Sequence, residues 1–144
     1  MGSSSQARVR SSAELREVLN VVLEAVDRDP DIGPRLRGAA APLRFELTDP
    51  ALMLTVEPAE NGCLKWDFDE SSEVKPKLRL SMTSDFANRL LQGRENPALA
   101  IVRGRLKTRV EDAAAALRFF GGAGALYGCY RKIVVERYPH LAVD

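Results

Sequence analysis

The sequence predicts an α+β fold: a five-stranded, mainly antiparallel sheet with helices packed on one face. Apolar residues recur with a helical period before residue 29, alternate with polar residues from residue 43, and return to a helical period after residue 84. No strand–helix–strand repeat occurs, which argues against a parallel sheet covered on both faces. At 144 residues the chain suits one domain. We expect that domain over residues 11–140, after a disordered lead-in at 1–10.

A first helix is predicted from Ser11 to Asp29. Ser11 and Glu14 have the spacing of a capping box, in which Ser11 accepts from the backbone and Glu14 reaches back. Asp29-Pro30 ends the helix. One apolar stripe follows its length: Leu15, Val18, Leu19, Val22 and Val26.

Period-two alternation then predicts strands over 43–47, 52–56 and 64–68. Asp49-Pro50 marks the first turn, and Asn61-Gly62 is a strong hairpin signal. These three strands are expected to form an antiparallel meander with one apolar face. A fourth strand is predicted over 78–82.

Two short helices and a fifth strand follow. Thr83 or Ser84 can cap a helix that ends at Gly93, and Asn96-Pro97 is a cap followed by a first-turn proline. Gly104 ends that second helix, and 106–110 alternates as a strand.

The last part of the chain is predicted as two helices joined by glycines. Glu111-Asp112 opens an alanine-rich helix, the joint covers 121–128, and a final helix ends at Pro139. The spacing of Gly122, Gly124 and Gly128 is close to a dinucleotide fingerprint, but such a fingerprint must follow a strand. Nucleotide binding is therefore not predicted. The glycines are either a flexible joint or a place where a helix or a ligand lies close to the backbone.

Composition and motifs argue against catalysis. Formal net charge is +1, and Cys63 and Cys129 form neither a C-x-x-C pattern nor a disulfide framework. His140 is the single histidine and lies near an end that we expect to fray. No nucleophile elbow, metalloprotease motif or phosphate loop occurs. We therefore expect no enzyme activity, cofactor or metal. Because the opening residues lack the apolar segment of a signal peptide, we also expect a soluble cytoplasmic protein.

Basic residues alternate on the last two predicted strands: Lys75, Lys77, Arg79, and Arg105, Lys107, Arg109. If these strands are neighbours, the outer sheet face carries a cationic stripe. This stripe is either a solvated face that blunts a sheet edge or a surface for transient contact with an anionic membrane or acidic partner. Nucleic acid is not expected, because aromatic stacking residues are sparse there.

Three segments resemble the sterol carrier protein type 2 family: Leu-Arg-Phe-Glu-Leu-Thr-Asp at 43–49, Leu-Arg-Leu-Ser-Met-Thr-Ser-Asp-Phe at 78–86, and Leu-Leu-Gln-Gly-Arg-Glu-Asn-Pro-Ala-Leu-Ala-Ile-Val-Arg-Gly-Arg-Leu-Lys at 90–107. The third is the most specific. The resemblance covers about residues 11–138. It implies a sheet and helices around an apolar tunnel that binds a hydrophobic small molecule (fatty acyl, acyl-CoA, sterol-like or isoprenoid lipid) without chemistry.

The tunnel that the resemblance implies should lie between the apolar sheet face and the helices after residue 83. Its expected lining is Phe45, Leu54, Trp66, Phe68, Phe86, Leu90, Leu99, Phe119, Phe120 and Tyr127. For each of these residues the ordinary alternative, a core residue without a ligand contact, is favoured, because apolar faces pack before they bind. The alternative function is a scaffold, dimerisation or accessory module whose interior is filled by side chains.

Overall fold

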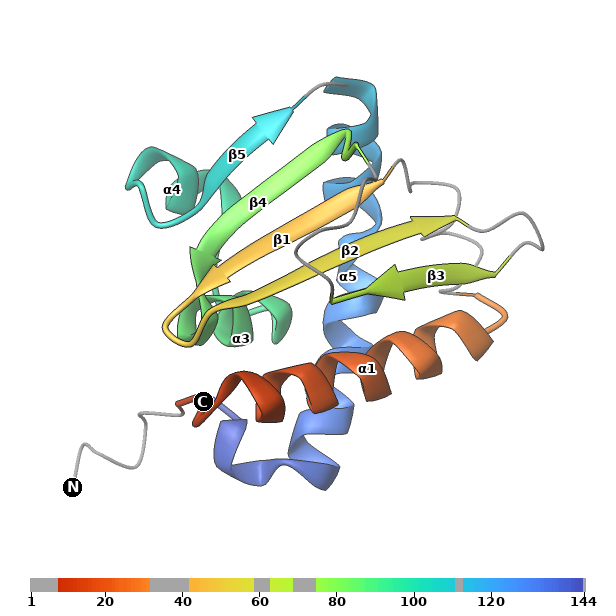
Figure 1. Ribbon diagram of the computed structural model, residues 1–144, viewed down its shortest axis with the longest axis vertical. Coiled ribbons are helices and arrows are strands. Elements are labelled where there is room, and N and C mark those ends of the chain that lie inside the picture. The colour runs from red at the N-terminus through yellow and green to blue at the C-terminus, as the bar shows by residue number, and fades with distance from the viewer. Residues whose placement is uncertain (1–7, 32–41, 59–62, 69–74, 111–112, 144) are drawn as a thin grey trace.

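The computed structural model describes residues 8–31, 42–58, 63–68, 75–110 and 113–143, with the backbone alone for residues 58, 110 and 113–123. The predicted Asn61-Gly62 turn, the Glu111-Asp112 helix start and residues 1–7 of the lead-in lie outside the described residues. The elements, in chain order, are α1 (Ser12–Arg28), β1 (Leu43–Thr48), β2 (Leu52–Pro58), β3 (Leu64–Asp67), β4 (Leu78–Thr83), α3 (Ser84–Leu91), α4 (Pro97–Val102), β5 (Lys107–Val110), α5 (Ala113–Arg137) and the 3₁₀ helix η2 (Pro139–Leu141) (Figure 1).

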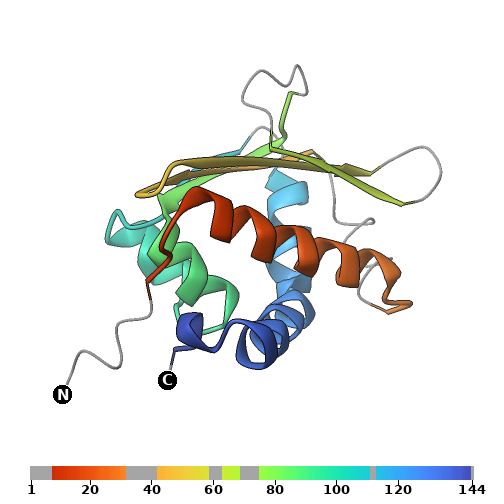
Figure 2. The same ribbon diagram turned by 60° about the horizontal axis from the view of Figure 1, so that its bottom comes forward.

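The predicted five-stranded sheet is confirmed, with strand order β3-β2-β1-β4-β5. Every pair is antiparallel except β1–β4, which is parallel because β4 returns beside β1 after the β1-β2-β3 meander. Figure 2 shows the sheet nearly edge-on, with α1, α3 and α5 all on the same side. The fold is therefore one sheet layer with one helical layer, as the sequence predicted.

The inner sheet face is apolar because inward positions pair across the strands. Phe45 on β1 lies opposite Leu54 on β2 and Leu80 on β4, and Leu47 lies opposite Met82. All five side chains are buried. Each fully buried side chain of this size contributes about 1.5–3 kcal/mol, so these cross-strand rows hold the sheet against the helices.

The predicted helix caps are present in the structure. Ser11 accepts a hydrogen bond from the Glu14 backbone N–H at 3.1 Å, while the Glu14 carboxylate accepts from the Arg10 N–H at 2.9 Å. The Glu14 carboxylate therefore bonds the residue before the cap, Arg10, instead of the cap residue Ser11 itself. Thr83 caps α3 and Asn96 caps α4, each by accepting from the N–H three residues later.

The predicted glycine joint is wrong, because α5 runs without interruption from Ala113 to Arg137. Each glycine in a helix interior costs about 1 kcal/mol relative to alanine. Tertiary packing outweighs that cost. Leu126, Tyr130 and Val134, spaced four residues apart, form one stripe that is buried against the core.

The expectation of a frayed C-terminal end is also wrong for the described residues. Leu141 is fully buried and Val143 is 7% exposed. After η2 the chain folds back onto α3, where buried side chains hold its backbone through hydrogen bonds.

Candidate ligand-binding site

A small apolar cavity lies between the inner sheet face and helices α1, α3 and α5. Its volume is about 40 Å³, and its surface is wholly apolar. The sheet contributes two side chains, and the three helices contribute the rest. The lining residues are Leu15, Leu19, Val22, Phe45, Leu47, Ala87, Leu91, Leu126 and Tyr130. The cavity holds a few atoms at most, far below the roughly 300 Å³ of a typical small-molecule site.

The expected tunnel residues are distributed over several places. Phe45 lines the cavity. Three others, Leu54, Phe86 and Leu90, are buried in the surrounding core without lining it. Tyr127 is half-buried on α5, and burial raises the pKa of its phenol. The side chains of Phe119 and Phe120 lie outside the described residues.

Leu99 lies on the exposed surface, 45% accessible to solvent, because α4 buries only Ala100. The structure therefore does not bring Leu99 together with the cavity.

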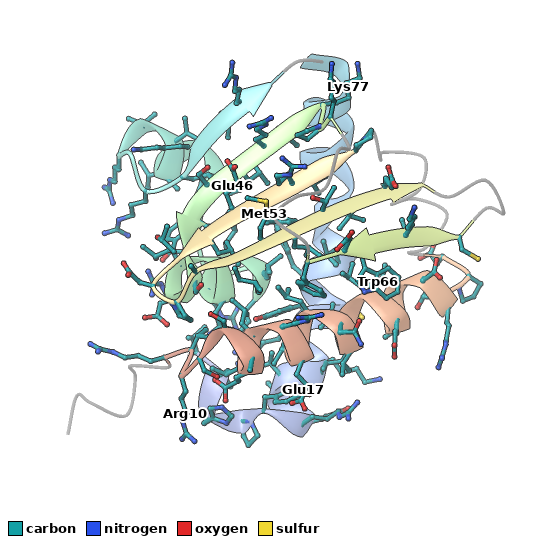
Figure 3. The ribbon with its side chains drawn as sticks, in the orientation of Figure 1. Arg10, Glu17, Glu46, Met53, Trp66 and Lys77 are labelled. Carbon is teal, nitrogen blue, oxygen red and sulfur yellow. The ribbon has the colours of Figure 1, made fainter. Side chains whose placement is uncertain are left out.

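Trp66 and Phe68 line a different feature, an open groove of about 490 Å³ between β3 and α1. Trp66 donates its indole N–H to the Asn20 side-chain oxygen at 2.9 Å, and the Arg16 guanidinium lies 5.1 Å above the Phe68 ring. Figure 3 shows Trp66 beside α1, at the edge of the sheet. The groove mixes polar and aromatic groups, unlike the interior cavity.

The sequence predictions omitted the contribution of α1 to the cavity. Leu15, Leu19 and Val22 belong to the apolar stripe that predicted this helix. The stripe could have indicated the contact, since the predicted fold places its helices on one face of the sheet and an apolar helix stripe must pack there.

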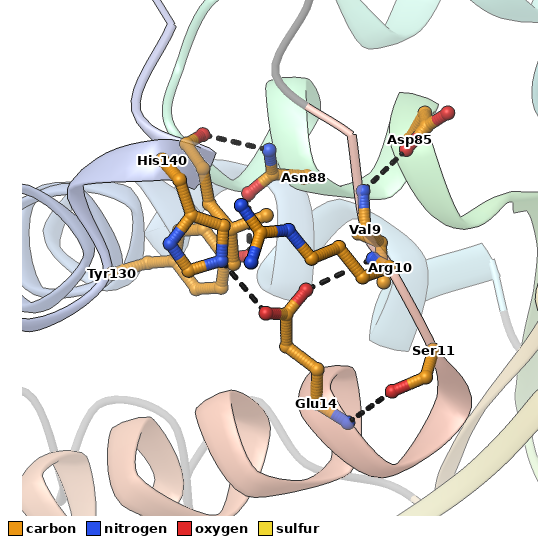
Figure 4. A network of polar contacts seen from close by, with 9 residues as sticks. Val9, Arg10, Ser11, Glu14, Asp85, Asn88, Tyr130 and His140 are labelled. Carbon is orange, nitrogen blue, oxygen red and sulfur yellow. Dashed lines mark hydrogen bonds and ion pairs between the residues drawn. The ribbon is translucent and has the colours of Figure 1, made fainter.

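A buried polar network joins the cavity wall to the end of the chain (Figure 4). Tyr130 donates its hydroxyl proton to the Asn88 side-chain oxygen at 2.8 Å, and Asn88 donates to the Leu141 carbonyl at 2.9 Å. Gln92 donates to the same carbonyl at 2.8 Å and accepts from the Val143 N–H at 3.1 Å. Burial strongly raises the pKa of Tyr130, so it stays a neutral donor.

A second contact fixes the same end of the chain to α1. His140 Nε2 lies 2.7 Å from Glu14 Oε2, while the other Glu14 oxygen accepts from the Arg10 backbone (Figure 4). The Val9 N–H donates to Asp85 at 2.8 Å. The start of the domain and its last residues therefore meet over one end of the helical layer.

The outer sheet face is basic along β4 and β5, which are neighbours as the cationic-stripe prediction required. Arg44, Arg79 and Arg109 stand in one row across β1, β4 and β5. Arg44 is buried and donates from Nε to the Thr55 hydroxyl at 3.1 Å. In the next row Ser81 donates to Glu46, which Figure 3 shows with Met53 on the face opposite the helices. On β1, β4 and β5 the outer face thus combines a row of cations with the Glu46 carboxylate, and Glu57 and Asp67 add carboxylates to the same face on β2 and β3.

The described residues offer no metal-binding cluster, and the environment of Cys129 does not activate its thiol. They contain no group of three or more histidine, cysteine or carboxylate side chains able to hold a metal ion. Burial, and then the Asp29 charge, raise the pKa of the Cys129 thiol, which disfavours the reactive thiolate. Among the helices described, none has the length and apolar character to cross a membrane.

Comparisons with solved structures identify the architecture. The chain is similar to the sterol carrier protein domain 2 of Helicoverpa armigera, with 15% identity, TM-score 0.66, and 85% of this chain and 95% of that one covered. It is also similar to apo sterol carrier protein 2 from Yarrowia lipolytica, with 16% identity, TM-score 0.56, and coverage of 87% and 94%. A third similar structure is a UbiJ-SCP2 ubiquinone synthesis protein, with 17% identity, TM-score 0.55, and coverage of 80% and 89%.

No curated protein sequence matches the chain. The sequence profile described as the SCP-2 sterol transfer family matches residues 19–118, which span α1 from its eighth residue, all five strands and the start of α5. This match covers well over half of the chain and agrees with the fold of the similar structures. The chain therefore belongs to the SCP-2 sterol transfer family.

Proposed function

We propose that this protein binds or transfers a hydrophobic small molecule, of the fatty acyl, acyl-CoA, sterol-like or isoprenoid class, without chemical change. The observation that carries the proposal is the wholly apolar cavity between the sheet and three helices, in a chain of a sterol transfer family. Each methylene moved from water into such a site gains about 0.8 kcal/mol. An elongated lipid is the ligand class that gains most from it.

Binding requires the cavity to grow from about 40 Å³. The middle of α5 is where the helical layer deforms most cheaply. It carries Gly121, Gly122, Gly124 and Gly128 within one helix, and glycine is the weakest helix former after proline. Leu126 lies among these glycines and lines the cavity. A bend in this stretch would move that cavity wall away from the sheet.

In the same proposal, cargo exchange takes place at an anionic membrane surface, approached through the basic strands. Arg79, Lys107 and Arg109 lie on the sheet face that α1, α3 and α5 leave uncovered. Juxtaposed cations of this kind attract the anionic headgroups of a leaflet.

The test is native mass spectrometry of the freshly purified protein, with solvent extraction, followed by titration with fatty acids and acyl-CoA. Two matched variants locate the ligand. Ala87→Leu places a larger side chain in the interior cavity, and Ala13→Leu does so in the outer groove. We expect a stoichiometric lipid mass that Ala87→Leu abolishes and Ala13→Leu leaves unchanged.

The opposite pattern would place the ligand in the outer groove and contradict the interior site. Overpacking a core costs about 1–3 kcal/mol, so thermal unfolding of Ala87→Leu must show an intact fold. Leu126→Ala gives a second check, because removing this wall should increase lipid uptake.

The alternative function is a scaffold, dimerisation or accessory module of the same fold without a bound lipid. The small volume of the cavity favours it, because the described side chains around that cavity leave only about 40 Å³ between them. A clean protein mass that ignores added fatty acids and acyl-CoA, in wild type and Leu126→Ala alike, would support this alternative.

A further inference from the structure

Helix α4 exposes an apolar face that no described element covers. Across the side chains that the structure describes, the exposed large apolar residues are Leu99, Ile101, Val102 and Val135. Three of these four belong to the six residues of α4, and Val102 is 83% accessible. The single buried residue of this helix is Ala100. An apolar cluster on so short a helix calls for a partner.

Basic side chains surround this apolar face. Arg94 precedes α4, and Arg103, Arg105 and Lys107 follow it; all four are exposed. The one acidic residue in the same stretch, Glu95, accepts a hydrogen bond from Arg89 at 2.9 Å. The cations continue from here into the basic rows of β4 and β5. The knob formed by α4 and its flanks is thus apolar at its centre and positive at its rim.

The geometry of the knob is fixed by its backbone. The Gly104 N–H donates to the Ile101 carbonyl at 3.1 Å, and the Arg105 N–H donates to the Ala100 carbonyl at 2.9 Å. This is the Schellman arrangement, and it requires the left-handed conformation that Gly104 adopts at φ +75°. The turn holds Arg103 and Arg105 on either side of the glycine, next to the exposed end of α4. The backbone of the knob therefore needs little further ordering when a partner binds to it.

We infer that α4 is a membrane anchor: Leu99, Ile101 and Val102 insert at the headgroup boundary of an anionic lipid bilayer, while Arg103, Arg105 and Lys107 contact the phosphates. In Figures 1 and 2, α4 lies at the edge of the molecule beside β5, where it can meet a flat surface. The inference deepens the proposed membrane contact, on which it rests, and does not depend on the interior ligand.

Two features favour a bilayer over a protein partner. The apolar face carries aliphatic side chains and no aromatic ones, whereas the core of a protein interface is enriched in Tyr, Trp and Phe. Six helical residues also extend only about 9 Å, short for a stable protein interface but sufficient for aliphatic groups to enter the headgroup boundary. The positive rim then complements an anionic leaflet.

The experiment is co-sedimentation with phosphatidylcholine vesicles, with and without phosphatidylglycerol. Val102→Asp has a matched control in Val135→Asp, the other exposed valine, which lies on α5. Arg103→Glu has a matched control in Lys132→Glu, also exposed on α5. We expect binding only to the anionic vesicles, reduced at least about tenfold by Val102→Asp and about fivefold or more by Arg103→Glu. Both controls should bind like wild type.

Raising the salt from about 0.1 M to about 1 M shortens the screening length from about 10 Å to about 3 Å and should release the protein. If wild type and Val102→Asp bind anionic vesicles equally, the anchor is wrong while the basic-face contact stands. If wild type binds neither vesicle, both are wrong. Equal binding to neutral vesicles would overturn the role of the cations. Val102→Ser, which adds no charge, repeats the test if thermal unfolding shows that Val102→Asp is misfolded.

Discussion

Replacing Gly124 and Gly128 by alanine should stabilise the protein. Both glycines lie in the interior of α5, and a methyl group added at either one would meet no atom within 4 Å. Neither has a positive φ. Alanine therefore fits both positions without strain and improves helix propensity by about 0.5–1 kcal/mol each. The double variant should gain about 1–2 kcal/mol in the free energy of unfolding.

That gain corresponds to a rise in the thermal midpoint of about 3–7 °C, given an unfolding entropy of about 2.1 cal/mol/K per residue. Calorimetry measures it directly. Gly93→Ala is the matched control, since Gly93 has φ +75° and a left-handed alanine is strained although there is room for its methyl group. Gly93→Ala should therefore lower the thermal midpoint.

A double variant with an unchanged or lowered midpoint would contradict the continuous helix. The functional consequence is separate. If bending of α5 admits the ligand, Gly124→Ala and Gly128→Ala should slow lipid association, measured by stopped-flow fluorescence with a labelled fatty acid. A stabilised protein with unchanged association kinetics would show that the ligand enters elsewhere.

Three further predictions concern Gln92, Tyr130 and the two cysteines. Gln92→Ala should lower the free energy of unfolding by about 3 kcal/mol, because its four hydrogen bonds are lost, and urea unfolding measures this. Gln92→Glu should lose a comparable amount, because its buried carboxylate keeps both oxygen contacts but faces two acceptors, the Asn88 oxygen and the Leu141 carbonyl, where the amide donated. Burial raises the pKa of Tyr130 above its ordinary 10.0. Above about pH 10 the unfolded chain therefore releases a proton that the folded chain keeps, and the free energy of unfolding falls as pH rises. Tyr130→Phe should reduce this pH dependence by about 1.4 kcal/mol per pH unit, measured by urea unfolding. Iodoacetamide should label exposed Cys63 before half-buried Cys129, and a reversed order by peptide mass spectrometry would contradict the described burial.

The sheet and the helix ends were predictable because they depend on local patterns. Alternation at 43–47 and 78–82 placed the apolar rows on the correct face, and side-chain oxygens at Ser11, Thr83 and Asn96 marked three helix starts. Local rules fail where contacts between residues far apart in the sequence determine the backbone conformation. Glycine propensity indicated a break in α5, whereas the packing of Tyr130 and Val134, both fully buried, keeps the helix continuous.

The cavity was less predictable than the fold. Period and polarity identify which side chains face inward, and they found Phe45, but they do not say which inward side chains leave space between them. That depends on how α1, α3 and α5 cross the sheet, and Ala87 lines the cavity because its small side chain leaves a gap there. Leu99 shows the reverse case. It has the right chemistry for a lining residue, yet its helix lies beside β5 with that face outward.

A small cavity among the described side chains is compatible with the proposed lipid carrier in its lipid-free state. An empty cavity costs about 24 cal/mol per Å³, so holding open about 260 Å³ beyond the present 40 Å³ would cost about 6 kcal/mol. That is comparable to the whole stability of a typical domain, about 5–15 kcal/mol. A buried chain of about twelve methylenes gains roughly 10 kcal/mol, enough to offset the expansion. The volume of the empty cavity therefore does not by itself distinguish a lipid carrier from a scaffold. The better criterion is how easily Leu126 and the glycines around it move away from the sheet.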